Sequence, residues 1–368
     1  MLVLKYEDVS AELDRRILAF IRQPDGGDAQ FETLALALFA YQYHANDAYR
    51  RYCDQRGLPP HEVSNWRRIP AVSAASFGDA RLATFPAGSA RFVFESSGTT
   101  RAGQRPSRHE LENSELYDAS LLGQFRRCVM PDRDRMPMLL FSPSFAEAPG
   151  SSLAYMLARI FDCHGSGGGF FITQGALDHE RALATLEAAT QATLVFGTAF
   201  ALVHFLDRCR AAGIRFSLPP GSRVVETGGF KGRSRSIERV EFYAMLGEFF
   251  GVPRTHCLSE YGMCELGSQW YDANLADYFS GSAPRFEVKI GPHWARHLVV
   301  DPVNAEPLRE GSGLLQLVDL CNRGSVAAVL TADRARDESG GFVFMGRAPG
   351  APPKGCSITI DSLLGHHA

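Results

Sequence analysis

The sequence has no Lys-rich or Arg-rich run and almost no excess of either charge. Lys and Arg together number 38, Asp and Glu number 41, and the formal net charge is −3. Proteins that bind nucleic acid normally carry a basic patch that neutralises phosphates. The composition therefore predicts no nucleic-acid partner.

A signal peptide and long apolar runs are also missing. The N-terminal stretch MLVLKYED lacks a basic region, an extended apolar segment and a small-residue cleavage site. No apolar run approaches the roughly 20 residues that a membrane-spanning helix needs. We therefore expect a soluble, cytoplasmic protein with no membrane span.

The eight cysteines are scattered, with no Cys-x-x-Cys pair and no His at metal-ligand spacing beside them. A zinc site requires such spacing, and a disulfide framework is typical of small secreted chains. The sequence predicts neither, and most of the cysteines are expected to be buried, reduced thiols.

The sequence instead contains periodic apolar patterns that are typical of helices and strands. Residues 8–57 predict a helical cover, because apolar residues recur there every three to four positions. Beyond it, short apolar runs alternate with amphipathic segments, which indicates βαβ units around a largely parallel sheet. The predicted strands are 91–95, 136–141, 170–173, 193–196 and 223–226, and the predicted helices lie near 111–129, 151–162, 178–190, 199–212 and 235–250.

From about residue 284 the pattern changes to closely spaced strands separated by Gly, Pro, Asn and Asp. These strands are predicted at 286–290, 297–300, 313–318, 326–330 and 342–345. We therefore predict two domains: residues 1–283 form α/β lobes with the helical cover, and residues 284–368 form a β-rich lobe with a C-terminal tail. The glycine-rich segment 165–169 does not open a helix, so we interpret it as a flexible turn and not a phosphate loop.

The strongest local motif is a hydroxyl-rich run that follows a predicted strand and presents side-chain and backbone donors to a polyphosphate. It consists of Ser96, Ser97, Gly98, Thr99 and Thr100. The run lacks the Gly-Lys-Ser/Thr ending of a Walker loop, and by itself it fits a polar surface turn as well.

A second motif lies far downstream, where Glu265 follows the pair Tyr261-Gly262. Glu265 could hold Mg²⁺ together with phosphates, and Tyr261 could stack on a nucleobase. Taken alone, the same residues fit a buried tyrosine beside a solvated glutamate. The two motifs become informative in combination and in this order.

In this order the motifs resemble the adenylate-forming enzyme superfamily, whose members make acyl-AMP from ATP and a carboxylate. Two further stretches match: Gly228-Gly229 stands at the adenine-contact segment, and Asp333 stands where the superfamily has the aspartate that grips both ribose hydroxyls. Gly346-Arg347 resembles the pair that precedes the hinge to a mobile C-terminal domain. The chain is most similar to the acyl-protein synthetase (LuxE-like) branch.

The resemblance implies an α/β fold with the large-domain architecture of the adenylate-forming enzymes: mostly parallel sheets flanked by helices, plus a smaller β-rich lobe. It implies an ATP/AMP-binding set comprising Ser96, Ser97, Gly98, Thr99, Thr100, Gly228, Gly229, Phe230, Tyr261, Gly262, Met263, Cys264, Asp333 and Arg347. The implied catalytic residues are Glu265, Lys231 and Cys356, with Glu265 also the metal ligand.

The sequence departs from the common superfamily pattern at the phosphate loop and at the downstream turn. Arg101-Ala102-Gly103 replaces the usual Gly-x-Pro-Lys, and Cys264 replaces a threonine. Arginine is no like-for-like substitute for lysine, and a thiol is a weak donor. Both changes bear on how the phosphates are held.

The end of the chain also departs, because the lid domain that carries the adenylation lysine is expected to be absent. That lysine would be dispensable, replaced by Lys231 or Lys354, or supplied by another subunit. Luminescence-type ligases share the short end and a nearby cysteine that accepts the acyl group as a thioester. Cys356, beside Lys354, matches that cysteine, and a neighbouring cation favours its thiolate.

The resemblance thus predicts ATP- and Mg²⁺-dependent activation of a carboxylic acid, expected to be a fatty acid, with release of pyrophosphate and transfer of the acyl group to a thiol. Coenzyme A, a carrier phosphopantetheine, Cys356 or a partner's cysteine could be the acceptor, and a reductase, a carrier or a lid-supplying protein could be the partner. Two alternatives stay open: an aryl-acid adenylating enzyme of secondary metabolism, acting on a phenazine-type acid, and a nucleotide-binding but catalytically silent subunit.

Overall fold

The computed structural model describes residues 6–96, 105–228 and 238–349. These residues divide into two compact units. Within the described ranges, unit 1 comprises residues up to 124, 263–269 and from 290 onward, and unit 2 comprises residues 125–262 and 270–289. The expected division lay at residue 283, whereas here the N-terminal helices and the C-terminal strands fall in the same unit.

Unit 1 begins with three helices, as predicted for residues 8–57. They are α1 (Tyr6–Ile21), α2 (Asp28–Ala45) and α3 (Asp47–Gln55). Asn46 separates α2 from α3 and caps α3, because its side-chain oxygen accepts a hydrogen bond from the Tyr49 amide at 3.1 Å. Short elements follow: η1 (Pro60–Glu62), η2 (Trp66–Arg68), β1 (Val72–Ser73) and α4 (Ser76–Asp79).

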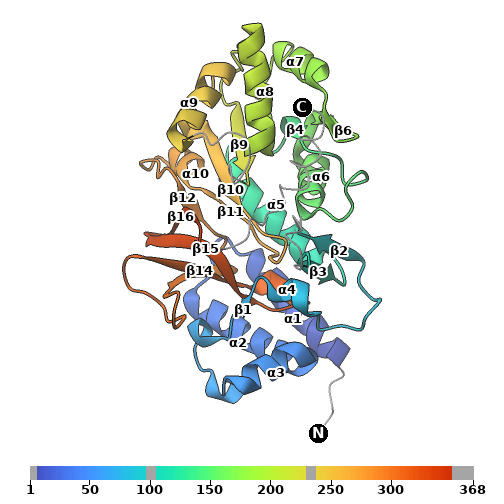
Figure 1. Ribbon diagram of the computed structural model, residues 1–368, viewed down its shortest axis with the longest axis vertical. Coiled ribbons are helices and arrows are strands. Elements are labelled where there is room, and N and C mark those ends of the chain that lie inside the picture. The colour runs from blue at the N-terminus through green and yellow to red at the C-terminus, as the bar shows by residue number, and fades with distance from the viewer. Residues whose placement is uncertain (1–5, 97–104, 229–237, 350–368) are drawn as a thin grey trace. The chain divides into compact units, whose positions relative to one another are not determined.

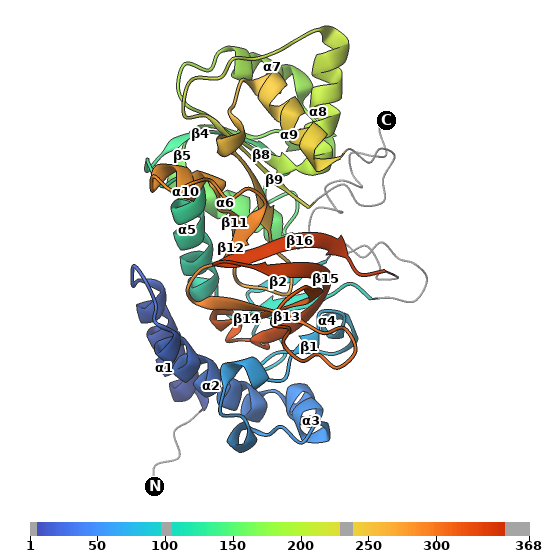
Figure 2. The ribbon, with the colours of Figure 1, turned by 90° about the vertical axis from the view of Figure 1, so that its left-hand side faces the viewer.

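Unit 1 also contains the closely spaced C-terminal strands. These are β13 (Ala295–Val300), β14 (Ser312–Asp319), β15 (Ala328–Glu338) and β16 (Gly341–Arg347), with η4 (Leu320–Asn322) after β14. They pair antiparallel in chain order, as Figure 2 shows, and β1 adds to β15 in parallel. The predicted change to closely spaced strands is confirmed.

Two long-range contacts bind the N-terminal helices to the turn after β14. The Gln42 side-chain amide donates to the Asn322 carbonyl at 2.8 Å, across 280 residues of sequence. Arg323 donates to the Asp14 carboxylate at 2.7 Å, across 309 residues. These contacts explain why both ends of the described chain share one unit.

The strand that precedes the hydroxyl-rich run forms a separate hairpin in unit 1. β2 (Phe92–Glu95) pairs antiparallel with β3 (Arg108–Leu111), with Phe94 opposite His109. Its expected place in the parallel sheet was therefore wrong, because a short apolar run fits either kind of pairing. Helix α5 (Glu115–Val129) follows.

Unit 2 contains the mostly parallel sheet. Its strand order is β12-β11-β10-β9-β8-β4-β5, and β10, β9, β8, β4 and β5 run parallel to one another. β11 pairs antiparallel with β10. The strands are β4 (Met136–Phe141), β5 (Gly165–Phe170), β8 (Leu194–Thr198), β9 (Arg223–Thr227), β10 (Cys257–Tyr261), β11 (Trp270–Asp272) and β12 (Val288–Ile290).

The helices of unit 2 follow the predicted alternation, and Figure 1 shows α8 and α9 side by side next to β9. The helices are α6 (Ser152–His164), α7 (His179–Glu187), α8 (Ala199–Ala212), α9 (Arg239–Phe250), η3 (Arg254–His256) and α10 (Asn274–Phe279). Thr198 caps α8 by accepting from the Ala201 amide at 3.0 Å, and Gly213 ends it with a φ of 67°.

Two local predictions for unit 2 need correction, and two strands were missed. The glycine-rich segment 165–169 is not a turn but most of β5, because a strand at the sheet edge needs only backbone hydrogen bonds from β4. The predicted strand 170–173 divides into the end of β5 and a small hairpin of β6 (Ile172–Thr173) and β7 (Ala176–Leu177). Strands β10 and β11 were not foreseen.

Candidate functional site

The base of the hydroxyl-rich run is ordered by the β2–β3 hairpin. Ser96 follows β2 and is 5% exposed. Its hydroxyl accepts from the Ser107 amide at 2.8 Å, and its own amide donates to the Ser107 carbonyl at 2.9 Å. The remaining predicted phosphate-loop residues lie outside the described residues; they are Ser97, Gly98, Thr99 and Thr100.

The downstream turn begins at the end of β10, where Tyr261 is buried in unit 2. Its ring lies edge-to-face against Trp270, with 6.4 Å between ring centroids. Gly262 is the last residue of this stretch of unit 2, and Met263 is the first residue of the stretch 263–269, which belongs to unit 1. Cys264 and Glu265 are each 2% exposed. The carboxyl of the predicted metal ligand is therefore held in a buried turn, not on a solvated surface.

The predicted adenine-contact segment is described only at its start. Gly228 follows β9 with a φ of 90°, in the left-handed region that favours glycine. Thr227, just before it, donates its hydroxyl to the Glu260 carboxylate, and burial raises the pKa of Glu260 to about 7. Gly229, Phe230 and Lys231 lie outside the described residues, as does Cys356.

Asp333 and Arg347 are brought together by strand pairing in unit 1. They lie opposite each other in β15 and β16, and Arg347 Nη1 is 3.2 Å from Asp333 Oδ1. The Asp333 amide donates to the Thr331 hydroxyl at 3.1 Å, and Asp333 is 5% exposed. The two residues were predicted separately for the ribose and phosphate; the structure joins them as a charge-assisted pair.

A buried polar network in unit 2 was missed by sequence analysis. Lys289 Nζ donates to Asp272 Oδ1 at 2.7 Å and to the Ser259 carbonyl at 2.9 Å. The Ser259 amide in turn donates to Asp272 Oδ2 at 2.9 Å. Burial lowers the pKa of Lys289 and raises that of Glu226 nearby. The network fixes the backbone of β10 at Ser259, two residues before Tyr261. The sequence did not reveal this network, because a single lysine within a predicted strand is not a recognisable motif.

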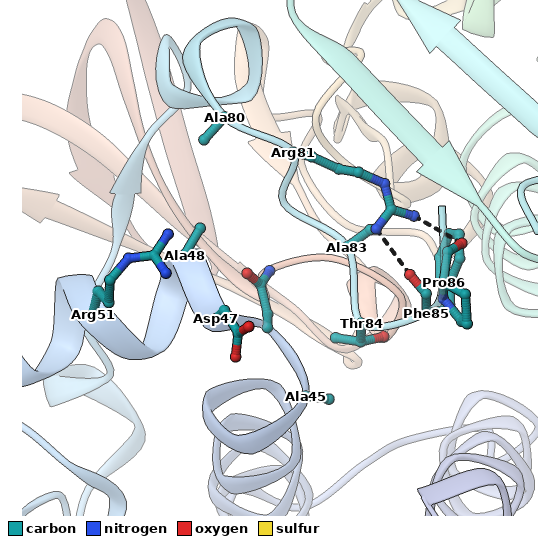
Figure 3. A pocket seen from close by; sticks show the side chains of 11 residues that line it. Ala45, Asp47, Ala48, Arg51, Ala80, Arg81, Ala83, Thr84, Phe85 and Pro86 are labelled. Atoms are coloured by element: carbon teal, nitrogen blue, oxygen red, sulfur yellow. Dashed lines mark hydrogen bonds between the residues drawn. The ribbon is translucent and has the colours of Figure 1, made fainter. Parts of the chain in front are cut away.

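A cavity of about 640 Å³ lies in unit 1 beside the start of α3 (Figure 3). Arg81 and Arg51 lie on different sides of it, and Arg81 donates to the carbonyls of Phe85 and Pro86 at 2.8 and 3.2 Å. Among the described residues predicted for nucleotide or metal binding, none lines this cavity. The predicted chemistry is therefore not located there.

Metal-ligand clusters and membrane spans were sought along the described ranges. No three His, Cys, Asp or Glu side chains come together there as a possible metal site. No helix within those ranges combines the length and apolarity needed to cross a membrane. Of the cysteines described, all but Cys163 are buried, and all are free thiols, as expected.

The parallel sheet and the antiparallel strands define the class of protein: the fold is that of the adenylate-forming enzymes. An open conformation of 2-hydroxyisobutyryl-CoA ligase, in complex with 2-HIB-AMP and CoA, matches with a TM-score of 0.63 and 14% identity, over 87% of this chain and 75% of that chain. The same ligase in its thioesterification state matches with a TM-score of 0.57 and 14% identity, over 84% of this chain and 64% of that one. At this identity the likeness establishes the fold.

The chain belongs to the LuxE acyl-protein synthetase family, whose model matches residues 9–363. It is 22% identical to the long-chain-fatty-acid–luciferin-component ligase of Vibrio harveyi over 380 residues, a match that covers 98% of this chain and 96% of that protein. The predicted superfamily, family and fold class are thereby confirmed, and the protein is a ligase of the acyl-protein synthetase type.

Proposed function

We propose that this protein uses ATP to convert a long-chain fatty acid into its acyl-adenylate and then passes the acyl group to a thiol. The observation that carries the proposal is the match of the acyl-protein synthetase family over residues 9–363. The name of the Vibrio harveyi relative supports a long-chain fatty acid as the substrate. The paired Asp333 and Arg347 and the buried turn at Glu265 supply polar groups of the required kinds.

In the first step, a carboxylate oxygen of the acid attacks the α-phosphorus of ATP. The bond from that phosphorus to the bridging oxygen breaks, and pyrophosphate leaves with the electron pair. Ser96, with the four residues after it, would donate hydrogen bonds to the phosphates as negative charge shifts between them. Gly228 would allow the backbone to approach adenine, and Tyr261 would pack against the base.

Asp333 would accept hydrogen bonds from the ribose hydroxyls, with Arg347 holding its carboxylate in place. Glu265 fits a magnesium ligand, because Mg²⁺ is usually held by one or two carboxylates together with substrate phosphates and needs no larger protein cluster. Bound there, Mg²⁺ would neutralise charge on the phosphate oxygens.

In the second step, a thiolate attacks the acyl carbon and AMP leaves. Cys356 is the proposed acceptor within the chain, and coenzyme A, a carrier phosphopantetheine or a cysteine of a partner reductase are the alternatives outside it. Lys231 is proposed to take the part of the adenylation lysine.

Exchange of radiolabelled pyrophosphate into ATP tests the first step, with a panel of fatty acids and flat aromatic acids. We expect exchange with long-chain fatty acids that is lost in Asp333→Ala and retained in Cys356→Ala. Asp337→Ala, in the same strand but exposed, is the matched control. Exchange with aromatic acids alone would favour an aryl-acid adenylating enzyme, and exchange with no acid would refute the proposal. Transfer of labelled acyl chains to the protein, lost in Cys356→Ala, would identify the acceptor.

A further inference from the structure

The turn that carries Glu265 is held from one side by Asp319, the last residue of β14, and by Asn322 of η4. Asn322 Nδ2 donates to the Glu265 carbonyl at 2.8 Å, and Asn322 Oδ1 accepts from the Gly267 amide at 2.8 Å. Asp319 accepts from the same amide at 3.0 Å and from the Ser268 hydroxyl at 2.8 Å. Asn322 and Asp319 are both fully buried. The backbone on the C-terminal side of Glu265 is therefore fixed by two side chains from one short segment.

Close packing reinforces this attachment. A Cβ atom added at Gly267 would lie 2.8 Å from the Cys321 Cβ atom, well inside van der Waals contact. The turn thus approaches η4 as closely as a residue without a side chain allows. Little room is left for the peptide of Glu265 to shift on that side.

From the other side, the turn is held by His109 of β3. His109 Nδ1 lies 2.8 Å from the Cys264 carbonyl oxygen, and Nε2 lies 3.1 Å from the Ser325 hydroxyl. A carbonyl only accepts, so Nδ1 carries the proton, and in the neutral ring Nε2 accepts from Ser325. His109 is 1% exposed, and burial lowers its pKa to about 4, which keeps the ring neutral.

His109 also connects this turn to the hairpin that carries Ser96. His109 lies opposite Phe94 in the β2–β3 hairpin, and Ser96 follows β2 directly. One imidazole therefore links the hairpin that carries Ser96 to the peptide next to Glu265. Asn322 holds the peptide on the far side of Glu265.

We propose that His109 and Asn322 are positioning residues for Glu265, and that they hold its carboxylate in a fixed place relative to the Ser96 hairpin for metal binding beside the phosphates. This inference rests on the proposed function. Neither residue touches the metal or the substrate in the proposed reaction. Both act by fixing the two peptide units that flank one side chain, and small displacements of a binding group cost affinity steeply.

Two substitutions of His109 separate its hydrogen bonds. His109→Asn places its amide nitrogen near the position of Nδ1, so the bond to Cys264 can be kept. His109→Gln places its amide nitrogen near the position of Nε2, so the bond to Cys264 is lost while a polar contact to Ser325 can remain. Asn322→Asp removes the donor to the Glu265 carbonyl but keeps an acceptor for Gly267, and it serves as the second test if His109→Gln fails to fold.

The measurement is binding of Mn²⁺, as a paramagnetic stand-in for Mg²⁺, to the full chain in the presence of ATP, followed by electron paramagnetic resonance. His109→Gln and Asn322→Asp are expected to raise the Kd of Mn²⁺ about tenfold, and His109→Asn to leave it within about twofold of wild type. In pyrophosphate exchange, the Mg²⁺ requirement should rise in parallel, with the KM for the fatty acid unchanged.

Equal Mn²⁺ affinity in wild type, His109→Gln and Asn322→Asp would overturn the inference, as would an equal loss in His109→Asn and His109→Gln. A parallel rise in the KM for the fatty acid would also overturn it, because a general structural defect would affect both ligands. If wild type itself shows no acid-dependent exchange, the proposed function fails and this inference fails with it. If wild type shows normal exchange and the variants bind Mn²⁺ as tightly as wild type, the inference is refuted while the proposed function stands.

Discussion

Replacing Lys289 by Met should destabilise the protein more than any exposed ion pair could. Lys289 and Asp272 have side chains that are 1% and 0% exposed, and they form the 2.7 Å pair in the network behind β10. The substitution leaves the Asp272 carboxylate buried without its counterion, and it removes the donor to the Ser259 carbonyl. Breaking a buried pair by removing one partner typically costs about 3–5 kcal/mol.

The double variant Lys289→Met, Asp272→Asn tests the cause of that loss. The asparagine is neutral, and its side-chain oxygen can still accept from the Ser259 amide. The penalty for an uncompensated charge then disappears, and the remaining cost should be about 1–3 kcal/mol for the unpaired Ser259 carbonyl. The double variant is thus expected to be more stable than the single one, although it carries one more substitution.

Arg285→Met is the matched control within unit 2. Arg285 binds Asp277 at 2.9 Å, but the arginine side chain is 40% exposed. Pairs of this kind contribute about 0–1 kcal/mol, because water screens and replaces them. The difference between Lys289→Met and Arg285→Met therefore compares a buried ion pair with a partly exposed one of similar N–O distance.

The assay is urea unfolding at pH 7 followed by tryptophan fluorescence. Trp270 lies in β11, two residues before Asp272, and Trp66 and Trp294 report on unit 1. Because two compact units need not unfold together, the transition has to be checked for a single step before free energies are compared. A loss below about 1 kcal/mol in Lys289→Met, or a double variant less stable than the single one, would refute the reasoning.

Three further predictions concern single carboxyl groups. Burial alone would raise the pKa of Asp132, but hydrogen bonds from Arg223 at 2.9 and 3.1 Å outweigh it and lower the pKa to about 2. The stabilisation from Asp132 is therefore present above its unfolded pKa of 3.8 and is lost as the pH falls toward 2. In urea unfolding, the difference in free energy of unfolding between wild type and Asp132→Asn should become smaller over that pH range. A difference that stays constant would contradict this prediction. Burial raises the pKa of Glu260 from 4.5 to about 7, so the stability of the protein should fall as pH rises through that range. Glu260→Gln should therefore have a higher melting temperature than wild type at pH 8 and the same melting temperature near pH 4. Equal melting temperatures at pH 8 would exclude the shift in pKa. Asp333→Asn should raise the KM for ATP about 10- to 100-fold in pyrophosphate exchange, because a charged acceptor becomes neutral, whereas Asp337→Asn should leave it within about twofold; equal effects would remove Asp333 from the nucleotide site.

The sequence was sufficient for the elements whose signal is local. Three- to four-residue periodicity predicted the N-terminal helices, and alternation of strands with helices predicted the parallel sheet of unit 2, because both patterns follow from backbone geometry within one segment. The ordered motifs around Ser96, Gly228, Glu265 and Asp333 were sufficient to predict the superfamily and the family.

Pairing partners were not predictable in the same way. The four residues of β2 form a short apolar run, and such a run fits a strand of a parallel sheet as well as a strand of a hairpin. The glycines of β5 give no strand signal, because their place in the sheet depends on backbone bonds to β4 and not on side chains. Partner choice depends on how the rest of the chain packs.

The sequence by itself determined the class of enzyme, the main helices and strands, and the residue types of the proposed site. Only the tertiary structure decided that Gln42 and Asn322 would meet, that Lys289 would be buried against Asp272, and that His109 would donate to the peptide next to Glu265. The physical reason is that each of these side chains is polar and is satisfied by a partner distant in sequence. Burial requires that partner, but no periodicity within a segment encodes which one it is.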